Sequence, residues 1–293
     1  MALIQAIEVT HFTDPGCPWA YSAWPAHATL RWRYGDALSW TNVMIGLTEE
    51  AAQYEARGYT PTRSALGYER FRRFGMPFQI TPKARLSATS PGCRAVVATR
   101  LAHPELEIHA LRALQFAQFT TTGTLDDPET LRSALATVHG LDADALVASI
   151  DSPDVREAYE ADRARARTAE GTPTEFQGRA ARTDGPVRYT APSLVFRSNG
   201  DCLEAGGFQP IEAYDVVIAN LDATLDRREP PEDVVEVLAA FPYALTTAEV
   251  AGVMCAHLAP TDPTGVEAAL IAATGEGRAE RRPIGDGSLW HLP

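Results

Sequence analysis

The first 47 residues alternate between strand-like and helix-like patterns, and this constrains the fold more than any other feature of the chain. Residues 3–12, LIQAIEVTHF, have the apolar pattern of a short strand. A helix is predicted over 17–34, with Pro18 near its start and Gly35 just past its end. Residues 38–47, LSWTNVMIGL, are rich in aromatic and β-branched residues and predict a second strand. This order favours two parallel strands joined by a right-handed crossover.

A single cysteine, Cys17, stands where the first strand meets the helix, within DPGCPWAY. The unpaired N–H groups and positive end of a helix favour a thiolate there, and Pro18 stiffens the turn without wasting a donor. Since only the thiolate is nucleophilic, the position predicts a reactive thiol whose pKa lies below the usual value of about 8.5. A buried structural cysteine is the alternative.

Proteins that exchange thiols and disulfides usually carry a second cysteine three residues after the first, on the same helix face. Here that position is Ala20, so the usual intramolecular disulfide cannot form at this site. The other cysteines (Cys93, Cys202, Cys255) lack helical spacing to Cys17 and match no zinc pattern. No metal site is therefore predicted. Trp19 is expected to shape the surface of the site, and Tyr21 to pack in the core.

The rest of the chain divides by composition. Residues from about 60 to 182 are helical in period and alanine-rich, and strand signals return at APSLVFRSNGDCLEAGG, where SNGD predicts a hairpin turn. Pro192, preceded by Ala191, stands at the entrance of that strand, which indicates either a simple strand-start proline or a cis peptide bond in a loop that could face the Cys17 helix. Pro173, in GTPTEF, is a weaker candidate. Phe74, Met76 and Phe78 could wall a pocket, although core packing is the simpler role.

The last 60 or so residues have a pattern of their own. Thr246 and Glu249 form a capping box, a helix is predicted from Pro263 to Gly275, and two strands flank a GDG turn. These features predict a small winged-helix-like module. From residue 241 onward it holds three arginines against six acidic residues. Because that sign opposes phosphate binding, we expect packing against the rest of the chain or a second subunit, not nucleic acid.

In these motifs and their order, the chain resembles the DsbA-like group of the thioredoxin superfamily, including its FrnE-like and 2-hydroxychromene-2-carboxylate isomerase branches. The resemblance rests on DPGCPWAY, the helical insertion, APSLVF with its hairpin, and GGFQPIEAYDVVIANL, over about residues 3–228. It implies that Cys17 is the nucleophile and that Pro192 is cis and lines the site. The substrate-binding residues expected on this basis are Pro18, Trp19, Ala20, Ala191 and Pro192.

The expected architecture is α/β: a thioredoxin fold with a large helical insertion and a winged-helix-like C-terminal module. The expected units are a thioredoxin-fold N-terminal part at 1–62, the insertion at 63–182, a thioredoxin-fold C-terminal part at 183–230 and the module at 231–293. His11, near the motif, is expected to be a satisfied strand histidine. Arg188 is a candidate contact for an anionic thiol ligand.

Two chemistries remain open from the sequence. In the first, Cys17 forms a mixed disulfide that an external low-molecular-weight thiol, of the glutathione or mycothiol type, resolves. In the second, the site holds a thiol cofactor for an isomerase or transferase acting on a small organic substrate. The isomerases generally have serine where this chain has Cys17, which favours the first. A catalytically silent binding protein is a third possibility.

The setting follows from charge and hydropathy. A net charge of −12 opposes broad nucleic-acid binding. No secretory signal pattern and no apolar run of about 18 residues is present, so a cytoplasmic protein without a membrane partner is expected. A homodimer is compatible with the sequence.

Overall fold

In the computed structural model, which describes residues 6–183 and 185–293, a four-stranded sheet has the order β2-β1-β5-β6. Its strands are β1 (Ile7–Thr13), β2 (Leu38–Met44), β5 (Ser193–Ser198) and β6 (Asp201–Ala205). The β1–β2 pair is parallel, and the β1–β5 and β5–β6 pairs are antiparallel. The predicted crossover and hairpin are therefore confirmed. Residues 3–5 of the predicted first strand lie outside the described residues.

The predicted helix at 17–34 consists of two helices, α1 (Pro18–Ser22) and α2 (Trp24–Tyr34), separated at Ala23. Pro25 explains the break, because it has no N–H to bond the Tyr21 carbonyl and its ring crowds that group. Gly35 ends α2 with φ at 48°, as its position predicts. Helix α11 (Ile211–Leu221) packs against α2, β5 and β6.

The helical portion follows β2 and begins before residue 63. Its helices are α3 (Ala52–Ala56), α4 (Pro61–Phe71), α5 (Ser90–Ala102), α6 (Glu107–Thr120), α7 (Pro128–Leu135), α8 (Ala143–Ser149), α9 (Pro153–Ala166) and α10 (Pro173–Phe176). Two short strands, β3 (Ala180–Ala181) and β4 (Arg188–Tyr189), then lead to β5. The predicted limit at 62/63 falls inside α4, and the predicted units remain a proposal.

One hydrophobic core joins the helical portion to the thioredoxin part. It includes Tyr21 and Trp24 from α1 and α2 together with side chains of α5 and α6. Met76 and Phe78 are buried in this core, which confirms packing as their role. Because the helical portion shares its core with α1, it holds the start of that helix in place.

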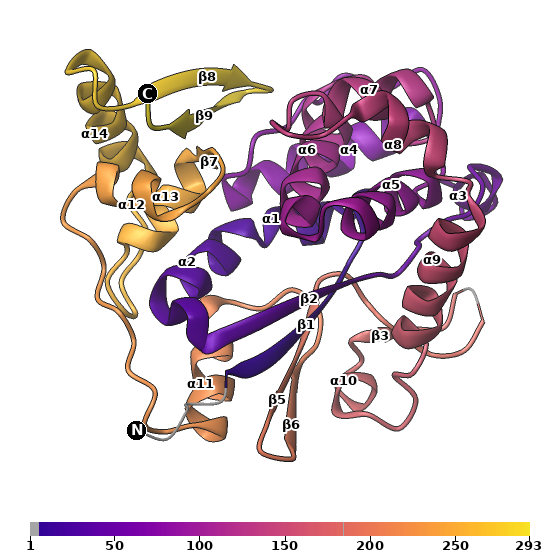
Figure 1. Cartoon of the computed structure of the whole chain (residues 1–293), viewed down its shortest axis with the longest axis horizontal. Coiled ribbons are helices and arrows are strands. Elements are labelled where there is room, and N and C mark those ends of the chain that lie inside the picture. Colours follow the sequence, from indigo (N-terminus) through magenta and orange to yellow (C-terminus); the bar gives the residue numbers. More distant parts are fainter. Residues whose placement is uncertain (1–5, 184) are drawn as a thin grey trace.

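The C-terminal residues form α12 (Val234–Ala240), β7 (Leu245–Thr246), α13 (Thr247–Met254), α14 (Pro263–Gly275), β8 (Glu280–Ile284) and β9 (Gly287–His291). The three strands make a small sheet of order β7-β9-β8. The predicted capping box and terminal hairpin are both present. Figure 1 shows this C-terminal module packed over α2.

The buried cluster of the C-terminal module includes two residues of α2. Ala28 and Trp32 of α2 share a buried cluster with Val250, Leu270 and Trp290 of the module. Arg112 of α6 also pairs with Glu249 of α13 at 2.5 Å, and both side chains are buried. Packing against the rest of the chain is thus the observed arrangement. None of the helices in the described part of the chain is long and apolar enough to cross a bilayer.

Two buried histidines, His11 of β1 and His27 of α2, contact each other. His11 Nδ1 is 3.1 Å from Asn42 Oδ1, and the His11 and His27 ring centroids are 4.8 Å apart. Burial lowers the pKa of His11 from 6.5 to about 4 and that of His27 well below 6.5, and the nearby Arg31 charge lowers both further. His11 is thus a strand histidine bonded to Asn42, but it is not fully satisfied as expected, because its buried Nε2 has no hydrogen-bond partner among the described residues.

We expect this pair to make the fold sensitive to mild acid. Since the pKa of His11 is lowered by folding, its contribution to stability is complete above pH 6.5 and is lost as the pH falls toward 4. For His11 alone the loss by about pH 5 is about 2 kcal/mol. Urea unfolding of the wild type and His11→Asn at about pH 7 and 5 measures it. The variant should lose less stability between the two pH values, whereas His139→Gln, at an exposed position, should behave as wild type.

Candidate active site

Cys17 is the residue that precedes α1, and it faces the loop before β5. Its backbone N–H donates to the Asp14 carbonyl at 3.1 Å, and its Sγ donates to the Ala191 carbonyl at 3.2 Å. The Ala191–Pro192 peptide bond is cis, which confirms the sequence prediction. Among the described residues Pro173 is not preceded by a cis bond. Two segments that are 174 residues apart in the sequence therefore meet at the sulfur.

The other predicted site residues surround Cys17 on different sides. Pro18 and Trp19 line a cavity beside the sulfur, and Trp19 is 41% exposed. Its ring lies 4.8 Å from that of Phe71, 5.7 Å from Phe74 and 5.4 Å from Phe208. Ala20 and Ala191 are buried and pack with Cys17 in the core. Direct contact of Ala20, Ala191 or Pro192 with a substrate stays a prediction.

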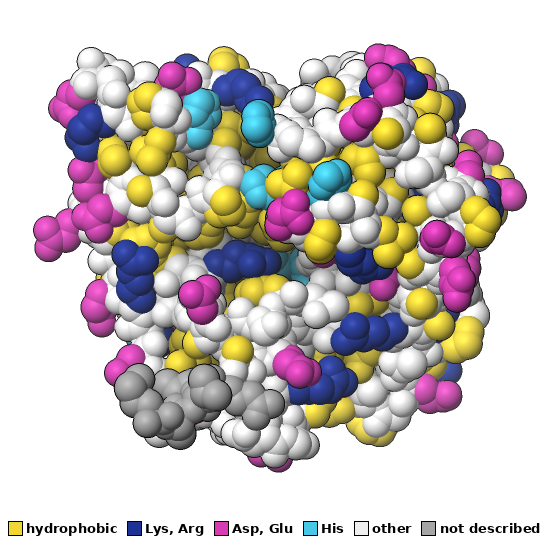
Figure 2. All heavy atoms as spheres, in the orientation of Figure 1, with side chains coloured by type: hydrophobic (Ala, Val, Ile, Leu, Met, Phe, Trp, Pro, Cys, Tyr) yellow, Lys and Arg dark blue, Asp and Glu magenta, His cyan; other side chains and the backbone are white. Residues whose placement is uncertain are grey.

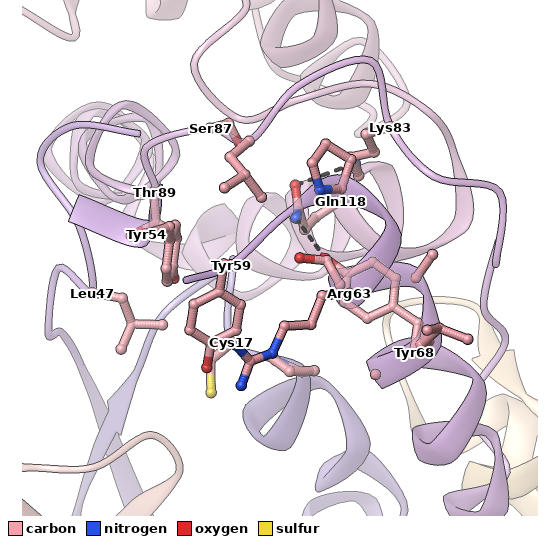
Figure 3. Close-up of a pocket in the computed structure, with 18 of the residues that line it drawn as sticks. Cys17, Leu47, Tyr54, Tyr59, Arg63, Tyr68, Lys83, Ser87, Thr89 and Gln118 are labelled. Carbon is pink, nitrogen blue, oxygen red and sulfur yellow. Dashed lines mark hydrogen bonds between the residues drawn. The ribbon is translucent and has the colours of Figure 1, made fainter. Parts of the chain in front are cut away.

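The cavity beside Cys17 has a volume of about 750 Å³. Its walls come from the start of α1, from α3 and α4 with the turn between them, and from residues 81–89 (Figure 3). Tyr54, Tyr59 and Tyr68 supply much of the aromatic wall. Figure 3 shows the Tyr59 hydroxyl and the Arg63 guanidinium pointing toward the Cys17 end of the cavity. These walls could not be predicted from the sequence, because no motif or periodicity links residues 54–89 to Cys17.

Asp14 organises the floor below Cys17. Its carboxylate accepts hydrogen bonds from the Gly16 N–H (2.8 Å), the Leu47 N–H (2.8 Å), Thr89 Oγ1 (3.0 Å) and Cys93 Sγ (3.3 Å). Burial raises its pKa, while these donors act in the opposite direction. Asp14 therefore accepts a backbone N–H within the turn before α1, and Cys93 is held by the same carboxylate.

The prediction of a lowered pKa for Cys17 is wrong. Burial raises the pKa of the thiol from 9.0 to about 12, and the Asp14 charge adds to the rise. Hydrogen bonds from the Ala20 and Trp19 amides lower the pKa, as the helix start implies, and so does the Arg188 charge. The loss of hydration outweighs these contributions because Cys17 is only 5% exposed and α1 has five residues.

We expect the alkylation rate of Cys17 to rise about tenfold per pH unit through the alkaline range, because its thiolate fraction does so below a pKa of about 12. Iodoacetamide labelling followed by peptide mass spectrometry measures this for each cysteine, with exposed Cys202 as the accessible reference. A plateau in the Cys17 rate below about pH 8 would show instead that the helix start dominates the pKa.

Arg188 lies closer to the site than the sequence alone indicates. It is buried, its Nη1 donates to the Tyr189 carbonyl at 3.1 Å, and its charge acts on the Cys17 sulfur. No group of three or more histidine, cysteine or acidic side chains in the described ranges is arranged to hold a metal ion. The site thus consists of one cysteine sulfur, a cis-proline loop and a cavity lined by aromatic and basic side chains.

A strand that delivers a cysteine to a helix start, opposite a cis-proline loop, defines a thiol site of the thioredoxin-like class. The chain belongs to the family of DSBA-like thioredoxin domains, whose model matches residues 8–189. The family is one of thiol-disulfide oxidoreductases. No curated protein matches the sequence.

Solved structures of similar fold are distant in sequence. A candidate protein disulfide isomerase from Nitrosomonas europaea is 19% identical, with a TM-score of 0.56 over 74% of this chain and 97% of that one. The cytosolic disulfide reductase DsbM from Pseudomonas aeruginosa is 17% identical, with a TM-score of 0.51 over 74% and 100% of the two chains. The structure of DsbM with GSH is 18% identical, with a TM-score of 0.50 over 73% of this chain and 98% of that one. These likenesses show a shared fold.

Proposed function

We propose that the protein is a single-cysteine thiol-disulfide oxidoreductase in which Cys17 forms a mixed disulfide and an external low-molecular-weight thiol resolves it. The observation that carries the proposal is the position of Cys17 Sγ, 3.2 Å from the carbonyl before a cis-proline and at the end of a cavity. Ala20 occupies the place where a resolving cysteine would stand.

The reaction has two exchange steps. In the first, the Cys17 thiol loses its proton and attacks a disulfide RSSR, which gives Cys17–S–S–R and releases RS⁻, and this takes up the proton as RSH. In the second, the thiolate of an external R′SH attacks the bond, which gives R–S–S–R′ and restores the Cys17 thiol. One disulfide is consumed and one is formed, so each cycle exchanges thiols without net oxidation.

The raised pKa of Cys17 supports the formation of a mixed disulfide and argues against a role as a strong oxidant of other thiols. A thiol of high pKa is a poor leaving group, so its mixed disulfide is long-lived, whereas strong oxidants stabilise the free thiolate. The cycle proposed here is thus an exchange of thiols and not an oxidase activity, and the external thiol has to displace Cys17 from a long-lived mixed disulfide. Glutathione is a candidate for the resolving thiol, since a relative of the same fold, DsbM, has been solved with GSH; a mycothiol-type thiol would serve the same step.

A cytoplasmic setting is part of the proposal. The four cysteines are unpaired, which suits a reducing compartment. A second candidate function, a thiol-dependent isomerase or transferase, is favoured by the cavity, whose volume suits a small organic substrate. Both functions use a thiol at the same place, and they differ in whether Cys17 itself forms the covalent bond.

Mass spectrometry of intact protein and of its Cys17 peptide tests the proposal. After exposure to oxidised glutathione, the wild type should carry one adduct on Cys17 that excess reduced thiol removes. Cys17→Ser should show no adduct there and should lose exchange activity altogether. A wild-type Cys17 that stays unmodified while exposed Cys202 is modified would exclude the oxidoreductase.

A further inference from the structure

The cavity beside Cys17 differs in charge from the protein as a whole. The chain carries a net charge of −12, and Figure 2 shows acidic and basic side chains interspersed over one face of the molecule. The cavity is lined by five basic side chains: Arg57, Arg63, Arg70, Lys83 and Arg85. None of the described residues that line it is acidic. A basic enclosure in an acidic protein is a local feature that a ligand would meet.

Within the described part of the chain, most of these cations form no ion pair with a carboxylate. Arg85 is the exception, since it pairs with Asp126 at 2.7 Å. Arg63 donates to the Gly58 carbonyl at 2.9 Å and its guanidinium lies 5.2 Å from the centre of the Tyr59 ring. Lys83, the sole lysine of the chain, contacts the Gly123 carbonyl and lies 3.4 Å from Gln118 Oε1.

Lys83 is the most informative of the five. It is half-buried in the cavity wall and contacts the polar groups of Gly123 and Gln118, while the Asp126 charge acts on it without a direct ion pair. Burial lowers its pKa from 10.5 to about 8. A bound anion would reverse that effect, because an opposite charge nearby favours the charged form.

Aromatic side chains form another part of the cavity wall. Tyr54, Tyr68, Phe71 and Trp19 line the cavity, and the Tyr68 hydroxyl is held by Gln118 Nε2 at 3.2 Å. A volume of about 750 Å³ fits a molecule of a few hundred daltons. Flat, apolar surfaces with a few charges at the edge are typical of sites for small aromatic or peptide-like anions.

We propose that this cavity selects small anionic substrates, namely low-molecular-weight thiols or disulfides that carry a carboxylate. The carboxylate would bind among Arg63, Arg70 and Lys83, with the sulfur directed to Cys17. The chemical step rests on the proposed function, whereas the preference for anions rests on the lining alone. Guanidinium and ammonium groups in a partly dehydrated site bind carboxylates by charge-assisted hydrogen bonds.

Two matched probe pairs separate binding from chemistry. In Cys17→Ser, calorimetry compares (methylthio)nitrobenzoate with its neutral methyl ester. In a Cys202→Ser/Cys255→Ser background, the Cys17 rates with dithiobis(nitrobenzoate), which carries two carboxylates, and with neutral dithiodipyridine are compared. Each rate is normalised to that of a free small thiol. Arg63→Gln/Arg70→Gln removes two cations, and Arg282→Gln removes an exposed one on β8 as the control.

The carboxylate probe is expected to bind about tenfold or more tightly than its ester, and the double variant should lose most of that preference. In the double variant, the ratio of the Cys17 rate with dithiobis(nitrobenzoate) to that with dithiodipyridine should fall by a similar factor. Arg282→Gln should match the wild type in both measurements. Equal binding of both probes with unchanged variants would overturn the anion preference, even if Cys17 reacts with both disulfides. If Cys17 reacts with neither disulfide while the carboxylate probe still binds selectively, the proposed oxidoreductase function is overturned and the anion site is supported. Binding of neither probe would overturn the cavity as a binding site.

Discussion

Replacing Ala20 by cysteine is expected to give a protein that links the new side chain to Cys17, whereas the wild type forms only mixed disulfides. Cys17 caps α1 and Ala20 is the third residue of that helix, so both lie on its first turn. The Ala20 amide donates toward the Cys17 sulfur, which places residue 20 beside it. Resolution then becomes intramolecular, and we expect release of a bound thiol to accelerate by about a hundredfold or more.

Free-thiol quantification and peptide mapping after mild oxidation measure the link, and insulin or a small disulfide serves to measure dithiol reductase turnover. Ser22→Cys is the matched control, because Ser22 is buried in the same helix but is five residues from Cys17 and lies on another face. It should remain unlinked. An Ala20→Cys protein whose two thiols stay free under the same conditions would contradict the register of CPWA at the helix start.

Local patterns were sufficient to predict the frame that presents Cys17. The strand–helix–strand order, the hairpin at Asn199 and Gly200, the capping box at Thr246 and the cis bond before Pro192 each depend on residues adjacent in sequence. Such features are set by turn chemistry and by the backbone limits of proline and glycine. The family resemblance then placed the distant Pro192 opposite Cys17.

The properties of the site that depend on packing could not be predicted in this way. Tyr59 and Arg63 reach the cavity because α4 packs against α1, and nothing in their own sequence marks this. The pKa of Cys17 depends on how much water the surrounding elements exclude. The helix start was therefore predicted correctly, but the predicted direction of the pKa shift was wrong. The break at Ala23 was predictable from Pro25, which stands four residues after Tyr21.

A second large effect is expected from Arg112→Met, which should lower the free energy of unfolding by about 3–5 kcal/mol. Arg112 of α6 is 3% exposed and donates to Glu249 at 2.5 and 3.0 Å and to the Ala244 carbonyl at 2.9 Å. Its guanidinium also lies 4.6 Å from the centre of the Trp24 ring. Removing it leaves the Glu249 carboxylate buried without its partner, at the junction of three parts of the chain.

The magnitude follows from burial and not from the ion pair as such, and the chain offers a matched control. Arg132 pairs with Asp144 at the same 2.5 Å, but these side chains are 38% and 81% exposed. Arg132→Met should therefore cost less than about 1 kcal/mol, because water solvates the remaining carboxylate. Urea unfolding at neutral pH compares the two variants. Because the C-terminal module shares its core with α2, we expect Arg112→Met to unfold in one earlier transition. A separate early transition confined to residues 231–293 would show that the module folds independently and that Arg112 only tethers it.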